Sequence, residues 1–224
     1  MRAQTLRAGV LALQGGVAEH AAMLEQLGAT VTLVRRASDL IGPDGPRLDA
    51  LVLPGGESST QDRLLRTFDI ADPLREVIAG GLPTLGTCAG LILLARAVQD
   101  PAPGQRTLGL LDVRVRRNAL GAQVASIEAE FTVQAAEVSG LGALGDVRGA
   151  LIRAPEIVSV GAGARVLAVR DGRILAATSL PPGATPGATT PESRLPLGSM
   201  TGIAFHPEIS GDPAFHRALL AQAR

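Results

Sequence analysis

A single cysteine is the first candidate for chemistry in this sequence. Cys88 lies between a short β-type run and an apolar helical run, with Gly86 two residues before it and Gly90 two residues after it. Glycines at these positions let the chain turn sharply from strand to helix, which exposes the side chain above a sheet edge. The N-terminus of the following helix favours the thiolate. An isolated cysteine is more often buried and inert, but this spacing predicts a nucleophile.

A thiol nucleophile needs a base, and the base needs a group that orients it. The segment Phe205–Glu208 offers both, because His206 and Glu208 are two residues apart. Side chains at this spacing on an extended segment lie on the same side. We therefore expect Glu208 to hold one ring nitrogen of His206 while the other faces Cys88. A surface His-Pro turn is the alternative interpretation.

A pair of glycines, Gly55 and Gly56, follows a buried β-type run. Glycine at the carboxyl end of a parallel strand lets the backbone approach a ligand. The N–H groups of this pair, with that of Ala89, are expected to bind an oxyanion. Glu57 and Ser58 would then hold a polar head group. An ordinary turn into a helix, with Ser58 or the serine after it as N-cap, is compatible with this role.

The other two histidines carry weaker signals. His20 lies on the first predicted helix, and we expect it to be structural or interfacial and not catalytic. His216 lies on the last predicted helix and is expected to be solvated or to cap that helix.

The composition excludes several kinds of chemistry. All 21 basic residues are arginine, so no side chain can form a Schiff base or complete a lysine-containing phosphate loop. One cysteine excludes an intrachain disulfide and a multi-cysteine zinc site, and we predict no metal site. The 21 basic residues balance 21 acidic ones, which argues against nucleic-acid or membrane partners. With no signal peptide or membrane segment recognised, the expected location is the cytoplasm.

The pattern along the chain predicts an α/β fold. The first part alternates predicted strands, at 8–13, 30–34, 50–53 and 83–86, with predicted helices, at 17–27, from about 58, at 73–79 and at 89–97. This rhythm indicates a three-layer architecture, in which an open, mostly parallel sheet has helices on both faces.

The second part predicts an antiparallel β extension to that sheet. Its predicted strands lie at 112–116, 123–133, 150–153, 157–160, 166–170 and 173–178, with a hairpin turn at Asp171-Gly172. The stretch 179–199 is rich in Pro, Gly, Ala and Thr and is expected to be a flexible loop. A short strand at 201–205 and a helix at 213–222 complete one domain spanning 1–224.

Segments spread along nearly the whole chain resemble the class I, triad-type glutamine amidotransferases, whose fold is flavodoxin-like: 9–15 with Glu19-His20, 53–58, 86–91 and 205–208. A narrower resemblance is to the glutaminase subunits of pyridoxal 5′-phosphate synthase. It rests on the first two of those segments, on 115–118 with Gly121 and Gln123, and on 152–155.

The resemblance implies hydrolysis of L-glutamine to glutamate and ammonia. Cys88 would form a γ-glutamyl thioester, His206 would serve as base and then acid, and Glu208 would orient His206. By the same resemblance the glutamine-binding residues are Gly56, Glu57, Ser58, Arg117, Ile152 and Arg153. For the two arginines, salt-bridged surface positions are the plainer interpretation.

The same resemblance implies a partner and no cofactor. Ammonia would pass to a synthase (lyase) subunit, within a large assembly built on a synthase dodecamer. The segment that holds Gln14, Glu19 and His20 would be a docking and activation surface. Pyridoxal phosphate would then be a product of the complex, since imine chemistry needs an amine side chain that this chain lacks.

Two other functions remain open at this point. A glutaminase serving another acceptor, such as imidazole glycerol phosphate synthase or a purine-pathway synthase, would carry the same triad but would leave the 115–118 segment unexplained. A non-catalytic regulatory subunit of the same fold would have a cysteine without unusual reactivity.

Overall fold

The computed structural model describes residues 5–119, 127–133, 146–180 and 198–223. Within these ranges a ten-stranded sheet has the order β2-β1-β5-β6-β14-β13-β11-β8-β7, with β12 paired to β13. Its parallel half is made of β1 (Arg7–Leu11), β2 (Thr30–Val34), β5 (Ala50–Leu53), β6 (Thr84–Thr87) and β14 (Met200–Ile203). Because these strands are parallel, the residues that follow β5, β6 and β14 meet at one edge of the sheet.

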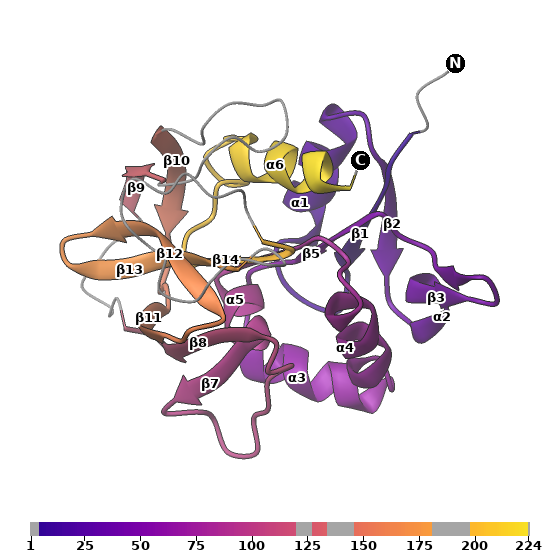
Figure 1. The fold of residues 1–224 in the computed structure, drawn as a ribbon, viewed down its shortest axis with the longest axis horizontal. Helices are drawn as coiled ribbons and strands as arrows, with labels where there is room; N and C mark the ends of the chain where they lie inside the picture. The colour runs from indigo at the N-terminus through magenta and orange to yellow at the C-terminus, as the bar shows by residue number, and fades with distance from the viewer. Residues whose placement is uncertain (1–4, 120–126, 134–145, 181–197, 224) are drawn as a thin grey trace.

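Helices cover both faces of the parallel half (Figure 1). The helices α1 (Val17–Gln26) and α6 (Ala214–Gln222) lie on one face, and α3 (Ser58–Thr67), α4 (Ala71–Ala79) and α5 (Ala89–Leu94) lie on the other. Strands buried on both faces must be apolar throughout. All four residues of β5 are buried, as this arrangement requires.

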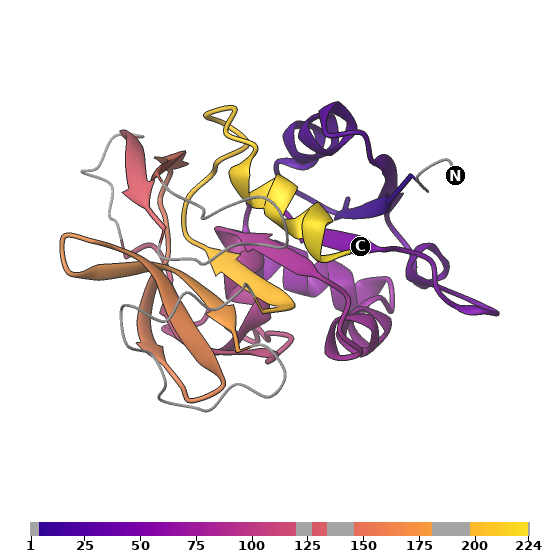
Figure 2. The same ribbon diagram turned by 45° about the horizontal axis from the view of Figure 1, so that its top comes forward.

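The antiparallel extension lies on the side away from β2 (Figure 2). It consists of β13 (Arg173–Ser179), β12 (Ala164–Arg170), β11 (Glu156–Val160), β8 (Leu111–Arg116) and β7 (Ala95–Gln99), although β7 itself pairs with β8 in parallel. Asp171 and Gly172 both have positive φ, 49° and 72°, which confirms the predicted hairpin turn. The predicted α/β fold with an antiparallel extension is therefore confirmed.

Three short elements were not predicted: α2 (Ala37–Leu40) and the two-residue strands β3 (Ile41–Gly42) and β4 (Gly45–Pro46). The helix predicted over 89–97 was too long. It ends at Leu94 because Ala95 turns to extended backbone (φ −55°, ψ 144°) and begins β7. The strand predicted over 150–153 lies earlier, as β10 (Asp146–Leu151).

The remaining strand, β9 (Ile127–Thr132), pairs with β10 in a separate two-stranded sheet. The start of the strand predicted over 123–133 and most of the loop predicted over 179–199 fall outside the described residues. In the part of the chain that is described, no helix has the length and apolar character needed to cross a membrane.

An aromatic cluster ties this small sheet to the main body. Phe205, which follows β14, stacks on Phe131 of β9 at a centroid distance of 4.3 Å and meets Phe215 of α6 edge-on at 5.8 Å. Phe205 and Phe215 are almost completely buried. This packing fixes the backbone directly before His206.

Candidate active site

The backbone at Cys88 is a strained strand-to-helix turn. Cys88 follows β6 and precedes α5, with φ 48° and ψ −99°, and its N–H donates to the Ile203 carbonyl at 2.8 Å. A Cβ on Gly90 would overlap the Leu53 carbonyl oxygen, and one on Gly86 would come within 2.6 Å of the Gly90 backbone. Glycine is therefore required on both sides of Cys88, as the sequence pattern predicts. The expectation that the Cys88 side chain is exposed was wrong, because the residue is buried and only 7% exposed.

His206 reaches this turn from the neighbouring strand. β14 pairs in parallel with β6, so that Ile203 lies opposite Thr87, and the chain then carries His206 to the same edge. Backbone hydrogen bonds of 2.9 and 3.1 Å between His206 and Ala150 of β10 hold this segment. His206 Nδ1 lies 2.7 Å from Glu208 Oε1, and Cys88 is close enough to the imidazole to be one of the groups that raise its pKa.

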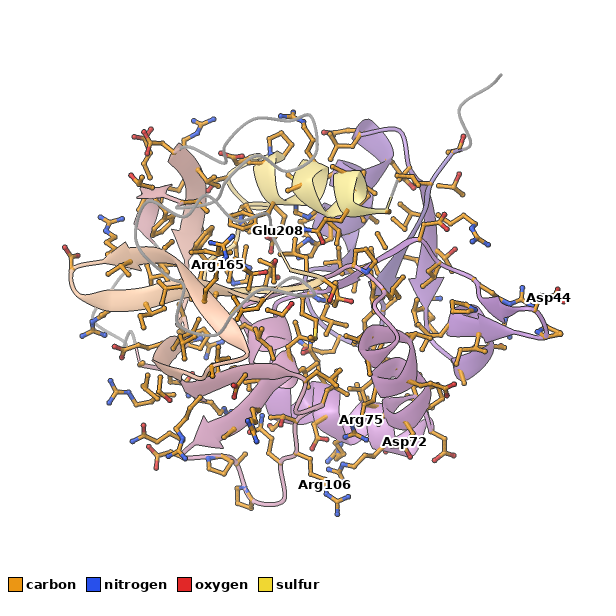
Figure 3. The ribbon with its side chains drawn as sticks, in the orientation of Figure 1. Asp44, Asp72, Arg75, Arg106, Arg165 and Glu208 are labelled. Atoms are coloured by element: carbon orange, nitrogen blue, oxygen red, sulfur yellow. The ribbon has the colours of Figure 1, made fainter. Side chains whose placement is uncertain are left out.

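The electrostatics of this group favour a charged imidazole. Burial alone would lower the pKa of His206, but hydrogen bonds and charge attraction from Cys88 and Glu208 outweigh it and raise the pKa to about 10. Burial would likewise raise the pKa of Glu208, but hydrogen bonds from His20 and His206 hold it well below its ordinary value. Glu208 is an ionised carboxylate in the interior, directly under α6 (Figure 3).

The loop after β5 that contains Gly55 and Gly56, here called the glycine loop, lies against the same histidine. A Cβ on Gly55 would overlap the His206 imidazole ring, so the loop backbone touches that ring. Two glutamines hold the loop in place. Gln14 Oε1 accepts from Glu57 N–H at 2.8 Å, and Gln61 Nε2 donates to the Pro54 and Gln14 carbonyls, both at 3.0 Å.

A polar cluster forms beside this loop. Arg117, which directly follows β8, donates to Glu57 Oε1 at 2.8 Å and to Gln105 Oε1 at 2.8 Å. Gln105 Nε2 in turn donates to Ser58 Oγ at 3.0 Å. The predicted ligand-binding residues Glu57, Ser58 and Arg117 are thus brought together, although Arg117 is 60 residues from Glu57 in sequence.

Glu57 also caps α3, which corrects the expectation of a serine cap. Its carboxylate accepts from Thr60 N–H at 2.8 Å and from the Ser59 hydroxyl at 2.5 Å. A carboxylate at a helix N-terminus satisfies N–H groups that have no helical partner. Burial would raise the pKa of Glu57, but these hydrogen bonds lower it to about 2. The side chain is therefore ionised at neutral pH.

The other predicted site residues occupy various positions. Ile152 and Arg153 directly follow β10, two and three residues after the Ala150 bridge to His206, and Arg153 has a positive φ of 43°. Ala89 is the first residue of α5. On α1, Glu19 is exposed. The predicted motif residues Gly121 and Gln123 fall outside the described ranges.

A family model described as the SNO glutamine amidotransferase family matches residues 10–182. The chain belongs to this family. Two curated proteins, both called pyridoxal 5′-phosphate synthase subunit PdxT, align along most of the chain. The one from Clavibacter michiganensis subsp. michiganensis is 45% identical and covers 95% of this chain and 88% of its own. The one from Leifsonia xyli subsp. xyli is 46% identical and covers 96% and 95%.

A solved structure titled "Crystal structure of glutamine amidotransferase" matches this SNO family member in fold. Its TM-score is 0.77 at 36% sequence identity, and the alignment covers 96% of this chain and 98% of that one. Fold and family therefore agree with the chemistry that the cysteine turn predicts.

Sequence reasoning missed the roles of two residues at this candidate site. Gln105, which links Arg117 to Ser58, lies in a loop with no local pattern to mark it. The expectation that His216 is solvated or a capping residue was wrong, because its side chain is completely buried against His20. The apolar residues around it, Phe215, Leu219 and Leu220, were the available signal that this face of α6 packs inward.

Proposed function

We propose that this chain hydrolyses L-glutamine to L-glutamate and ammonia with Cys88 as nucleophile. The observation that carries the proposal is that the Cys88 turn lies at the same sheet edge as the His206–Glu208 pair, in which Nδ1 and Oε1 are 2.7 Å apart. A nucleophile bonded to a base, and a base bonded to an orienting carboxylate, is the arrangement that acyl transfer requires.

In the first half-reaction the Cys88 thiolate attacks the side-chain amide carbon of glutamine. The carbonyl π electrons move onto oxygen, and the N–H groups of Gly55, Gly56 and Ala89 stabilise that oxyanion. The imidazolium of His206 gives its proton to the amide nitrogen as the C–N bond breaks. Ammonia leaves, and a γ-glutamyl thioester remains on Cys88. A pKa of about 10 keeps His206 protonated for this step at neutral pH.

In the second half-reaction His206 acts as a base. Once the thiolate has become a thioester, one of the two partners that raise the pKa of His206 is gone, and the neutral imidazole can take a proton from water. The hydroxide attacks the thioester carbon, the C–S bond breaks, and glutamate leaves with Cys88 again a thiolate. Glu208 stays ionised throughout and keeps Nδ1 of His206 protonated.

The polar cluster beside the glycine loop is proposed to hold the amino-acid end of glutamine. A carboxylate such as that of Glu57 suits an α-ammonium, and an arginine such as Arg117 or Arg153 suits an α-carboxylate. Gly56, Ser58 and Ile152 complete the proposed pocket. The proposal is supported by the direct hydrogen bond from Arg117 to Glu57 and by Gln105, which links Arg117 to Ser58.

The acceptor of the ammonia is proposed to be a pyridoxal 5′-phosphate synthase subunit. The relatives' names carry this inference, since both are called subunits of that synthase. A cytoplasmic assembly on a synthase dodecamer is the proposed setting. Docking and activation would involve the segment that holds Gln14, Glu19 and His20, in which Glu19 is exposed and His20 is completely buried. A contact of Gln14 supports this setting. Gln14 lies in the segment before α1, and its side chain accepts a hydrogen bond from the backbone N–H of Glu57.

The test is release of glutamate from glutamine by the purified chain, with and without the synthase subunit. Release that the partner increases and that Cys88→Ala abolishes is the expected result. Normal turnover by Cys88→Ala would overturn the proposal. Recovery of a different synthase in a pull-down of the native partner would replace the proposed acceptor while leaving the glutaminase chemistry in place.

A further inference from the structure

Two buried histidines lie directly behind the proposed triad. His20 of α1 and His216 of α6 are both completely buried, and His20 Nδ1 lies 2.7 Å from His216 Nε2. The other ring nitrogen of His20, Nε2, lies 3.3 Å from Glu208 Oε1 and 3.1 Å from Thr87 Oγ1. Thr87 directly precedes Cys88. The pair therefore contacts the segments that carry both the nucleophile and the orienting carboxylate.

The direction of these hydrogen bonds follows from burial. Burial first, and the adjacent His20 second, lower the pKa of His216 to about 3, so this ring is neutral and carries one proton. Among the described residues, His216 Nδ1 has no hydrogen-bond partner. A proton there would leave a buried N–H without an acceptor, which is energetically unfavourable. The proton therefore belongs on Nε2, which donates to His20 Nδ1.

The same reasoning assigns the proton of His20. Because its Nδ1 accepts from His216, its own proton lies on Nε2, which faces Glu208 and Thr87. Glu208 Oε1 then lies 2.7 Å from Nδ1 of His206 and 3.3 Å from Nε2 of His20, which is also 3.1 Å from Thr87 Oγ1. Glu208 Oε2 has no partner in the described part of the chain. One carboxylate oxygen thus depends on two donors.

We propose that His20 is a positioning residue of the triad, which donates from Nε2 to Glu208 Oε1 and is held in that tautomer by His216. This rests on the proposed function, since it assigns a role relative to Cys88 and His206. His20 keeps the carboxylate ionised and aimed at His206 Nδ1. It touches no reacting atom, and it acts through Glu208.

The inference connects the triad to two helices on one face of the sheet. The charged or titratable groups around Glu208 are His206 on its own segment, His20 on α1, His216 on α6 and Cys88 at the turn. Glu19 also lies in this region, since its Oε2 and Glu208 Oε1 are 3.5 and 3.9 Å from a Cβ built on Gly16. A displacement of α1 would move His20 relative to Glu208.

The experiment compares His20→Gln with His20→Met in the full-length chain, assayed with its synthase partner. The two side chains are nearly equal in shape, but only glutamine offers an N–H where Nε2 stands. We expect His20→Met to lower kcat/KM about tenfold or more, as loss of a hydrogen bond to a charge does, and His20→Gln to recover most of it. KM for glutamine should change little.

The pH profile separates positioning from a structural role. Without the His20 donor, Glu208 is easier to protonate, so the acid limb of kcat/KM should move about one pH unit or more upward in His20→Met and not in His20→Gln. Equal losses in both variants, or an acid limb that stays in place in His20→Met, would overturn the proposal. If His20→Met does not fold, His216→Met and His216→Gln provide the same comparison with the same expected order.

A second readout does not depend on glutamine turnover. The rate of Cys88 alkylation by iodoacetamide, followed against pH, reports the thiolate–imidazolium pair directly. If the acid limb of the alkylation profile is displaced in His20→Met, the positioning role is supported. This holds even if the wild-type chain releases no glutamate, because that failure would count against the proposed function alone. Identical alkylation profiles for the wild type and His20→Met would contradict the positioning role.

Discussion

Gly55 lies directly against the imidazole ring of His206, in a space that no side chain can share. A Cβ at this position would overlap the ring, so the strand-end glycine and the proposed base occupy complementary volumes. The glycine loop is therefore part of what orients His206, together with Glu208 on its other side. Binding of an oxyanion and orientation of the base depend on the same short segment.

Gly55→Ala should lower kcat/KM by about 100-fold, because displacement of a catalytic group by about 1 Å has effects of this size. The fold should be retained, as the displaced ring is at the edge of the sheet. Steady-state glutaminase assays with the partner, together with circular dichroism, would measure both effects. Gly172→Ala is the control, because that hairpin glycine has open space around it and only a positive φ to strain. Equal kinetics in Gly55→Ala and wild type would contradict the packing.

Arg117→Met should raise KM for glutamine about tenfold or more, with a smaller effect on kcat. The substitution removes two hydrogen bonds, to Glu57 and Gln105, and leaves the Glu57 carboxylate without its arginine. The KM of Arg117→Lys should lie between those of the wild type and Arg117→Met, since lysine keeps the charge but cannot form the planar two-pronged contact.

Arg116→Met is the matched control for that measurement. Arg116 is the neighbouring residue, but its guanidinium pairs with Glu156 at 2.6 Å and not with Glu57. We expect its KM to match the wild type. A KM that rises equally in both variants would mean that Arg117 has no special place in glutamine binding.

Local patterns predicted the parallel half of the fold well. The strands β2 and β5 have the bounds that the sequence indicates, and α1 ends one residue early, before Gly28 with its φ of 85°. These elements are short, strongly patterned and closed by turn residues. The strand β7 could not be found in this way. It continues an apolar run from α5, and what makes it a strand is its pairing with β8, which is a non-local contact.

The residues of the candidate site likewise fall into those that local motifs predict and those that only long-range packing reveals. Cys88, Glu57 and His206 belong to short motifs whose chemistry shows in neighbouring residues, and the structure brings their segments together. The burial of His216 depends on the packing of α6 beside α1, elements almost 200 residues apart along the chain. Gln105 similarly joins two distant segments. Residues that act only through long-range packing leave no local pattern.

Glu19→Arg should weaken activation by the synthase partner. Glu19 is exposed on α1, and its turn of helix lies next to the segment that holds the glycine loop through Gln14. Titration of the synthase subunit into a glutaminase assay would give the half-activating concentration, which we expect to rise several-fold. Glu25→Arg, an equally exposed charge reversal on the same helix, is the control. Unchanged half-activation in Glu19→Arg would remove Glu19 from the docking surface.

The buried histidines should give the stability of the protein a distinctive pH dependence. His216 titrates near 6.5 when unfolded and at about 3 when folded, so the unfolded state binds an extra proton between these values. The free energy of unfolding should therefore fall as pH drops through this window, by about 1.4 kcal/mol per pH unit for the one proton. Below pH 4.5 the lowered pKa of Glu208 adds to the loss.

His206 acts in the opposite direction. Its pKa rises from 6.5 to about 10 on folding, so its contribution is complete below pH 6.5 and is lost as the pH rises toward 10. Together the two histidines predict greatest stability near pH 6.5. Urea unfolding from pH 3 to 10 would test this, followed by far-ultraviolet circular dichroism because the chain has no tryptophan or tyrosine. In His216→Met the free energy of unfolding should depend less on pH below 6.5 and be unaffected in its pH dependence above it. The His206 contribution is already complete below pH 6.5. Parallel curves for wild type and His216→Met between pH 4.5 and 6.5 would show that His216 does not stay neutral in the folded chain.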